Sequence, residues 1–281
     1  MSQKQKARKL HGRKDHWLPQ GYMRGFIAPS RFGECKPLWC YDRHDDEWRC
    51  VSTKEIGHGV GFYDYASGTA DYSPVTHPDS VFARLEREFP SKRDQMARNR
   101  FEDWENHKDF LLDYMQMLRA RSPLAMEEQL AHARSLRGST ITSVAPDRRS
   151  VTVDSLELRP LPGPFVRNIS ITNMLADVKA GDWATAMDWC LRYTDDEKNP
   201  FCAMDQAVIV VGTVPVEQVS FELLRHPDTI VRFPLCWQAC LFGSPLKFDK
   251  SYDVAHPIQL ASIRNEQKEK CNRFVISPVR Y

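Results

Sequence analysis

The chain has 281 residues, of which 42% are hydrophobic and 27% are charged, a composition that excludes an intrinsically disordered protein. No run of about 20 apolar residues occurs, so the sequence predicts no membrane-spanning helix and no membrane partner. The N-terminus lacks the apolar stretch of a secretory signal, and we therefore expect a cytoplasmic protein. A chain of this length is able to form a single domain with a large core.

The formal net charge of +2 predicts no overall attraction to nucleic acid, yet the charges are unevenly placed. Six basic residues precede Asp15, the first acidic residue of the chain. We interpret residues 1–14 as a flexible basic tail and residues 15–281 as one domain. Such a tail is able to contact the phosphates of a nucleic acid or a nucleotide without reading a sequence. The alternative interpretation is an ordinary solvated tail.

Residues 16–27 follow the tail with a helical pattern, in which bulky apolar residues recur every three or four positions. Pro19 suits the first turn of such a helix, where the missing N–H costs nothing. We therefore expect His16, Gln20 and Arg24 to lie one turn apart on a common face, which would stack an imidazole, an amide and a guanidinium.

The next elements are short. The apolar segments 37–41 and 48–51 flank an acidic turn and predict a β-hairpin. The glycine-rich segment 57–61 lacks the strand, the helix and the Lys-Ser/Thr pair of a phosphate-binding loop. We interpret this segment as a plain loop.

Helices are predicted for the middle of the chain, at 79–98, 101–120 and 124–137. Pro90 is expected to end or kink the first of them. The second should stop just before Pro123, because the residue before a proline avoids helical dihedral angles. Residues 139–168 are rich in Ser, Thr, Pro and Arg, and we interpret them as a mobile loop.

After one more predicted helix at 169–187, the pattern changes to strands. The predicted strands are 189–193, 208–211, 230–233 and 240–242. A last helix is predicted at 257–270 and a last strand at 274–277. The order of elements predicts an α+β fold. We expect a helical central bundle with a small mixed or antiparallel sheet, built from the N-terminal hairpin and the C-terminal strands.

Eight cysteines occur, but without the Cys-x-x-Cys spacing that is typical of zinc sites. Cys35 and Cys40, together with His44, would make a partial metal-binding set. Small buried apolar side chains are the favoured interpretation of the cysteines. The sequence therefore predicts no metal site, and it indicates no particular cofactor.

Four polar positions stand out from the apolar background. They are His16 with Gln20 and Arg24, the pair Arg119 and Arg121 at the end of a helix, Asp205 with Gln206, and Asn265 in the last helix. A histidine exchanges protons near neutral pH, and carboxamides orient a polar ligand by donating and accepting hydrogen bonds.

The order of short motifs along the chain resembles that of the bacterial domain-of-unknown-function family 4238. The motifs are His16-x-x-Pro19-Gln20 with Met23 and Phe26, Trp39–Asp42, Ser52–Ile56 with Phe62-Tyr63, Arg121-Ser-Pro123, Asp205, Phe233–Leu235, Asn265 and Val275–Ser277. The family's Ser-Asp-Asn-Pro keeps only its Asp here, and its Leu-Ser-Pro has become Leu-Cys-Trp. The resemblance implies no established activity. It suggests a shared pocket built from His16, Gln20, Asp205 and Asn265.

Two functions fit these residues. The first is a nucleic-acid- or nucleotide-directed hydrolase with His16 as general acid or base and Asp205 orienting it, and with Arg24 or Arg121 holding a phosphate or carboxylate. Phosphodiester chemistry is favoured over acyl transfer, because no Gly-x-Ser-x-Gly elbow occurs. The alternative is a non-catalytic binding or interaction module in which the same polar residues form a structural network.

Overall fold

A computed structural model describes most of the chain. The described residues are 14–63, 78–135, 182–212 and 226–281, with the short segments 137–138, 143–144, 151–152, 159–160, 166–167 and 170–171. Nearly all of the predicted basic tail and most of the predicted loop at 139–168 lie outside the described residues. None of the described helices is long and apolar enough to cross a membrane.

The helices and strands follow one another in an α+β order, which confirms the predicted fold class. The helices are α2 (Gln20–Met23), α3 (Pro78–Arg98), α4 (Lys108–Ala120), α5 (Pro123–Ser135), α7 (Asp182–Thr185) and α8 (Pro257–Lys270), with 3-10 turns at Arg24–Phe26, Pro29–Arg31 and Trp104–His107. The strands are β1 (Lys14–His16), β2 (Leu38–Asp42), β3 (Glu47–Val51), β4 (His58–Val60), β5 (Arg137–Gly138), β6 (Ser143–Val144), β7 (Val151–Thr152), β8 (Arg159–Pro160), β9 (Asp188–Tyr193), β10 (Ala203–Met204), β11 (Ile209–Val211), β12 (Ile230–Cys236), β13 (Ala239–Ser244), β14 (Tyr252–Val254) and β15 (Phe274–Ser277).

One antiparallel sheet joins the two ends of the sequence, in the order β10-β15-β2-β3. The predicted N-terminal hairpin is its β2–β3 pair, and Tyr41 lies between Trp48 of β3 and Val275 of β15. The C-terminal strand is buried along its whole length. The expected union of the N-terminal hairpin with a C-terminal strand is therefore confirmed.

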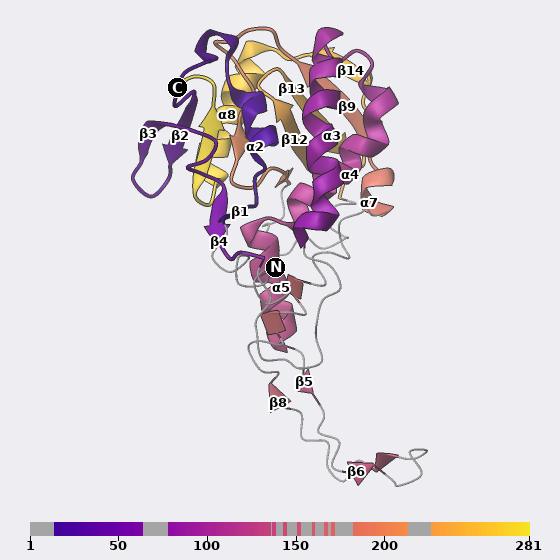
Figure 1. Ribbon diagram of the computed structural model, residues 1–281. Helices are drawn as coiled ribbons and strands as arrows, with labels where there is room; N and C mark the ends of the chain where they lie inside the picture. Colours follow the sequence, from indigo (N-terminus) through magenta and orange to yellow (C-terminus); the bar gives the residue numbers. More distant parts are fainter. Residues whose placement is uncertain are drawn as a thin grey trace.

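A second, larger sheet has the order β11-β12-β13-β9-β14, and only its β14–β9 pair is parallel. Every residue of β13 is buried. The helices α3 and α4 lie side by side across the strands of this sheet, while α8 lies near the β2–β3 hairpin (Figure 1). The principal core forms between these helices and the sheet, where apolar side chains such as Leu111, Phe233 and Leu241 are fully buried.

The predicted helix over 16–27 is only partly correct. His16 lies in β1 and pairs with His58 of β4, so residues 58–60 form a strand rather than the expected loop. The helix α2 begins at Gln20, because Pro19 has an extended ψ of 139° and the residue before a proline avoids the helical region. His16 therefore does not share a helical face with Gln20.

The start of α4 also differs from the prediction of 101–120. Arg100 and Phe101 have φ angles of 51° and 63°, which no α-helix accommodates, and a 3-10 turn separates them from Lys108. The predicted helix at 169–187 is described at residues 170–171 and at α7, and residues 172–181 lie outside the described residues. The helix α5 ends at Ser135, slightly before the predicted boundary.

Pro90 was expected to end or kink its helix, and α3 continues through it to Arg98, so this proline does not end the helix. Gly21 of α2 lies against its ring: a Cβ atom at Gly21 would be 2.8 Å from Cγ of Pro90. The absence of a side chain at residue 21 thus permits close packing of α2 on α3. That packing places the buried Tyr22 between the helices and the larger sheet, where its hydroxyl donates to the carbonyl oxygen of Pro234 at 2.8 Å.

We predict that Gly21→Ala lowers the free energy of unfolding by about 1–3 kcal/mol, because the new methyl group collides with the Pro90 ring. Pro90→Ala removes that ring, so the double variant should lose less stability than the sum of the two single variants. Urea denaturation of the four proteins measures both quantities. Strict additivity of the two losses would contradict the proposed contact.

Candidate functional site

A cavity of about 580 Å³ lies where the end of α4, the helix α5, the segment from β10 to β11 and the connection from α8 to β15 meet. We call it the α4–β10 cavity. Its lining consists of Gln116, Arg119, Ala120, Ser122, Leu124, Ala125, Glu128, Gln129, Met204, Gln206, Ala207, Val208, Ile209, Val210, Lys270 and Asn272. The volume is in the range of small-molecule binding sites.

The lining divides by chemistry. Met204 and the segment 207–210 supply an apolar wall, to which α5 adds Leu124 and Ala125. Four carboxamides line the cavity. Gln116 and Gln129 belong to the helices α4 and α5, whereas Gln206 and Asn272 belong to connections between elements. An apolar wall with a few convergent polar groups is typical of a ligand-binding site.

Two of the charged side chains in the lining are close to one another. Arg119 lies over the ring of Trp183, with 5.4 Å between its guanidinium carbon and the ring centroid. Desolvation raises the pKa of Glu128, and the positive charge of Arg119 opposes that rise. A carboxyl group with a raised pKa at the border of a cavity is a common mark of functional sites.

The third charged side chain belongs to the end of α8. Lys270 pairs with Glu266 at 2.7 Å, and Glu266 also pairs with Arg232 of β12 at 2.6 Å. The pKa of Glu266 is lowered: burial opposes this, but the hydrogen bonds from Lys270 and Arg232 outweigh the burial. The ion-pair chain fixes the lysine at the border of the cavity.

Arg121 was expected to bind a substrate, but its guanidinium is fully buried and occupied by protein groups. It donates to the carboxylate of Glu86 in α3, to the backbone carbonyl of His16 and, over 3.1 Å, to the hydroxyl of Tyr63. Its guanidinium carbon also lies 4.6 Å from the ring centroid of Phe82. The structure thus brings Arg121 and His16 together, but through a backbone atom rather than through the imidazole.

The side chain of His16 lies in the small β1–β4 sheet. Its ring packs edge-on against His58, with 5.3 Å between the ring centroids. Gln20 is partly buried at the first position of α2, whereas Arg24 is exposed in the following 3-10 turn. None of the three belongs to the lining of the α4–β10 cavity.

Asp205 is buried, and backbone groups use its carboxylate. Asn272 and Arg273 donate their backbone N–H groups to its two oxygens at 3.3 and 3.0 Å, and its own N–H donates to the carbonyl of Phe274. Desolvation raises the pKa of Asp205 to about 6, against the lowering effect of these hydrogen bonds. Asp205 therefore holds β10 onto the connection between α8 and β15.

Asn265 is exposed on α8, at a separate surface depression. Tyr41, Arg43 and Asp46 of the N-terminal hairpin line this depression, together with Lys268 and Glu269. The ammonium nitrogen of Lys268 lies 4.4 Å from the ring centroid of Tyr41. The predicted catalytic residues thus have separate surroundings: His16 in the β1–β4 sheet, Asp205 beneath the cavity and Asn265 at this depression.

Immediate neighbours of two predicted residues do reach the cavity. Arg119 precedes Arg121 by two positions, and Gln206 follows Asp205. Glu128 is a lining residue that the sequence analysis missed. The signal was present, because Leu124, Ala125, Glu128 and Gln129 have the spacing of one helical face. A mixed apolar and polar face was not distinguishable from an ordinary surface without the facing strands.

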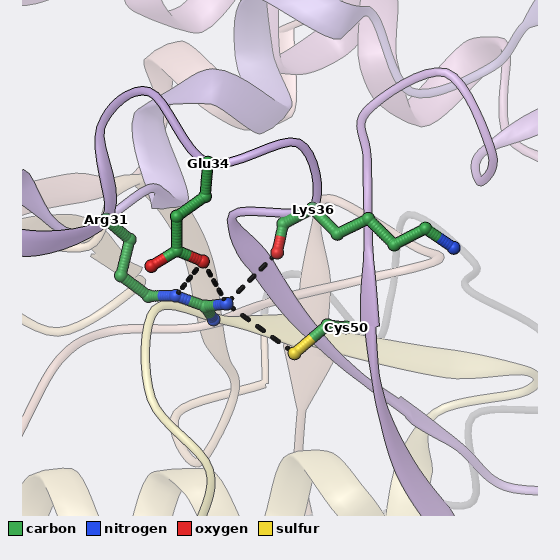
Figure 2. A network of polar contacts seen from close by, with 4 residues as sticks. All are labelled: Arg31, Glu34, Lys36 and Cys50. Carbon is green, nitrogen blue, oxygen red and sulfur yellow. Dashed lines mark hydrogen bonds and ion pairs between the residues drawn. The ribbon is translucent and has the colours of Figure 1, made fainter.

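A polar network at the surface connects the turn after α2 to the hairpin (Figure 2). Arg31 donates to the carboxylate of Glu34 at 2.6 Å, to the backbone carbonyl of Lys36 at 3.0 Å and to the thiol of Cys50 at 3.5 Å. The Lys36 side chain points away from this network in Figure 2, and it pairs with Glu55 at 3.0 Å. Arg31 therefore links the 3-10 turn at Pro29–Arg31 to residues 34–36 and to Cys50 of β3.

No group of three or more His, Cys, Asp or Glu side chains that could hold a metal ion occurs in the described part of the chain. Of the partial set considered above, Cys35 and His44 are exposed whereas Cys40 is fully buried in β2. These positions do not form a ligand set.

Comparison of the chain with models of protein families, with curated proteins and with solved structures found no match. The resemblance to domain-of-unknown-function family 4238 therefore stays a prediction. The assignment of the site rests on the geometry and the chemistry of the cavity.

We predict that Arg121→Met lowers the free energy of unfolding by about 3 kcal/mol, because the change removes a buried cation from three acceptors. The matched control is Arg87→Met, at an exposed position of α3, which should change the stability by less than about 0.5 kcal/mol. Urea denaturation compares the two variants. Equal losses would show that the Arg121 contacts contribute little.

The raised pKa of Asp205 predicts a dependence of stability on pH. Its value is about 6 in the folded chain against an ordinary value of 3.8, so the folded state binds more protons between these values. Stability from this group should therefore increase as the pH falls from 7 to 4. Asp205→Asn removes the effect, so the stability difference between variant and wild type should change by about 2–3 kcal/mol over that range.

Urea denaturation at several pH values measures this difference. The control Asp249→Asn, at an exposed loop position, should change the free energy of unfolding by less than about 0.5 kcal/mol. A flat difference for Asp205→Asn would contradict the assigned pKa.

Proposed function

We propose that the chain is a binding protein for a small ligand, which occupies the α4–β10 cavity. The observation that carries this proposal is the division of the lining, in which an apolar wall from Met204 and residues 207–210 accompanies carboxamides and charged groups. A solvent-filled surface groove needs no continuous apolar wall. A ligand with an apolar body and polar substituents would cover the apolar wall and satisfy the polar groups.

The surroundings of the predicted catalytic residues favour this function over a hydrolase. The two oxygens of Asp205 accept backbone N–H groups, so this carboxylate acts as a brace. Asn265 lies at a different depression from the cavity. The proposal corresponds to a binding module with a structural polar network. Hydrolysis of a nucleotide or nucleic acid, and contact of the basic tail with phosphates, stay predictions that deletion of residues 1–13 and assays with His16→Ala would test.

Ala125→Trp should weaken binding, because Ala125 lines the cavity and the indole would occupy part of it. The probe is N-phenyl-1-naphthylamine, a neutral apolar dye whose fluorescence increases in an apolar cavity. We expect saturable binding to the wild-type protein and at least a tenfold weaker affinity in the variant, which corresponds to about 1.4 kcal/mol or more.

The control is Ala131→Trp, which places the same indole at an exposed position of the same helix. It should bind the dye as the wild-type protein does. Circular dichroism and urea denaturation establish that both variants are folded. Unchanged binding to folded Ala125→Trp, or no saturable binding to the wild-type protein, would contradict the proposal.

A further inference from the structure

We infer that the ligand of the α4–β10 cavity carries an anionic group, a phosphate, sulfonate or carboxylate, which Arg119 and Lys270 bind. This inference rests on the proposed function and adds the chemical class of the ligand. The described lining holds these two cations against one carboxylate, that of Glu128. A positive surplus beside an apolar wall favours a ligand that is apolar at one end and negatively charged at the other.

The geometry of Arg119 suits an anion. Its guanidinium carbon lies over the ring of Trp183, 5.4 Å from the ring centroid, which places the positive charge against an aromatic side chain. The N–H groups of a guanidinium project in its plane, where a carboxylate or phosphate is able to accept two of them. Stacking on a neighbouring ring also fixes the orientation of the side chain, so less conformational entropy is lost on binding.

Lys270, the second cation of the lining, is the last residue of α8. The carboxylate of Glu266 lies between Lys270 and Arg232, so three charged groups leave one net positive charge there. Of these three groups Lys270 lines the cavity, so its ammonium group is available at the border of the cavity.

Glu128 is the negatively charged residue of the lining, so its replacement should affect an anionic ligand in the opposite direction to replacement of Arg119 or Lys270. Glu128 and Arg119 both line the cavity, and the positive charge of Arg119 opposes the rise of the Glu128 pKa. A ligand anion at Arg119 is repelled by Glu128. Neutralising Glu128 should strengthen the binding of an anion, whereas neutralising Arg119 or Lys270 should weaken it.

The remaining polar lining restricts the body of the ligand. Carboxamides donate and accept hydrogen bonds at once, so Gln116, Gln129, Gln206 and Asn272 suit polar edges such as those of a nucleobase or an amide. The apolar wall suits an aromatic or aliphatic portion. A nucleotide and an alkyl or aryl carboxylate share the required combination of an apolar face and an anion.

The experiment uses two dyes that differ only by a sulfonate, 8-anilino-1-naphthalenesulfonate and the neutral N-phenyl-1-naphthylamine. Fluorescence titration gives the affinity of each dye for the same protein. We expect the sulfonate to bind more tightly to the wild-type protein. Arg119→Gln and Lys270→Gln should each weaken the sulfonate about tenfold and leave the neutral dye unchanged, since a charge-assisted contact contributes about that factor.

Glu128→Gln should tighten binding of the sulfonate severalfold. The matched controls are Glu127→Gln, at an exposed neighbouring position outside the lining, and Lys247→Gln, at an exposed loop position. Neither control should change the preference between the dyes by more than about twofold. An unchanged affinity of the neutral dye shows that each variant keeps its cavity.

The outcomes separate the two proposals. If the neutral dye shows no saturable binding to the wild-type protein, the proposed function fails. If the neutral dye binds but the sulfonate has no advantage, or keeps its advantage in Arg119→Gln and Lys270→Gln, the anionic class is wrong while the binding function stands.

Competition then distinguishes the two sources of the anion. Displacement of the bound sulfonate by adenosine monophosphate assigns a nucleotide, and displacement by octanoate assigns a carboxylate with an aliphatic body. Failure of both anions to displace the sulfonate at saturating concentration would overturn the inference.

Discussion

The buried guanidinium of Arg121 is the constraint on which much of the structure depends. A cation that is removed from water requires several acceptors, and the chain supplies them from distant segments. Glu86, the carbonyl of His16 and the hydroxyl of Tyr63 all accept from it. The end of α4, the helix α3 and the strand β1 must therefore meet at one point, although about 105 residues separate the first and the last of these segments.

The same principle explains Asp205 on the other side of the cavity. A buried carboxylate requires donors, and the backbone of residues 272–273 provides them. Two buried charges thus hold the walls between which the α4–β10 cavity lies. Arg121 and Asp205 bind neighbouring segments together, whereas Arg119 and Gln206, close to them in the sequence, line the cavity.

Helical geometry explains why Arg121 is buried while Arg119, two residues before it, lines the cavity. Residues two positions apart on a helix point in directions that differ by roughly 200°. Arg119 and Arg121, at the end of α4, therefore point to nearly opposite sides. Arg121 reaches the interior behind the helix, where Phe82 and Tyr63 cover it. Arg119 reaches Trp183 and the cavity. A pair of arginines that appears as one polar site in the sequence therefore serves two purposes.

Much of the fold followed from local patterns. The spacing of apolar residues predicted the last helix at 257–270 and the last strand at 274–277 with the bounds that the structure has. The hairpin of β2 and β3 was predictable from its acidic turn. Such elements are determined by short-range periodicity, which the sequence displays directly.

Other elements depended on contacts that no local pattern displays. Pro90 stays inside α3, where Gly21 leaves room for its ring, and His16 becomes a strand residue because His58 pairs with it. The candidate site was predictable only as a set of polar types. The sequence by itself determined which residues carry charge, and its local pattern predicted the bounds of α8 and β15. Only the tertiary structure decided which charges are buried as braces and which face the cavity, because desolvation and hydrogen-bond partners come from segments far apart in the chain.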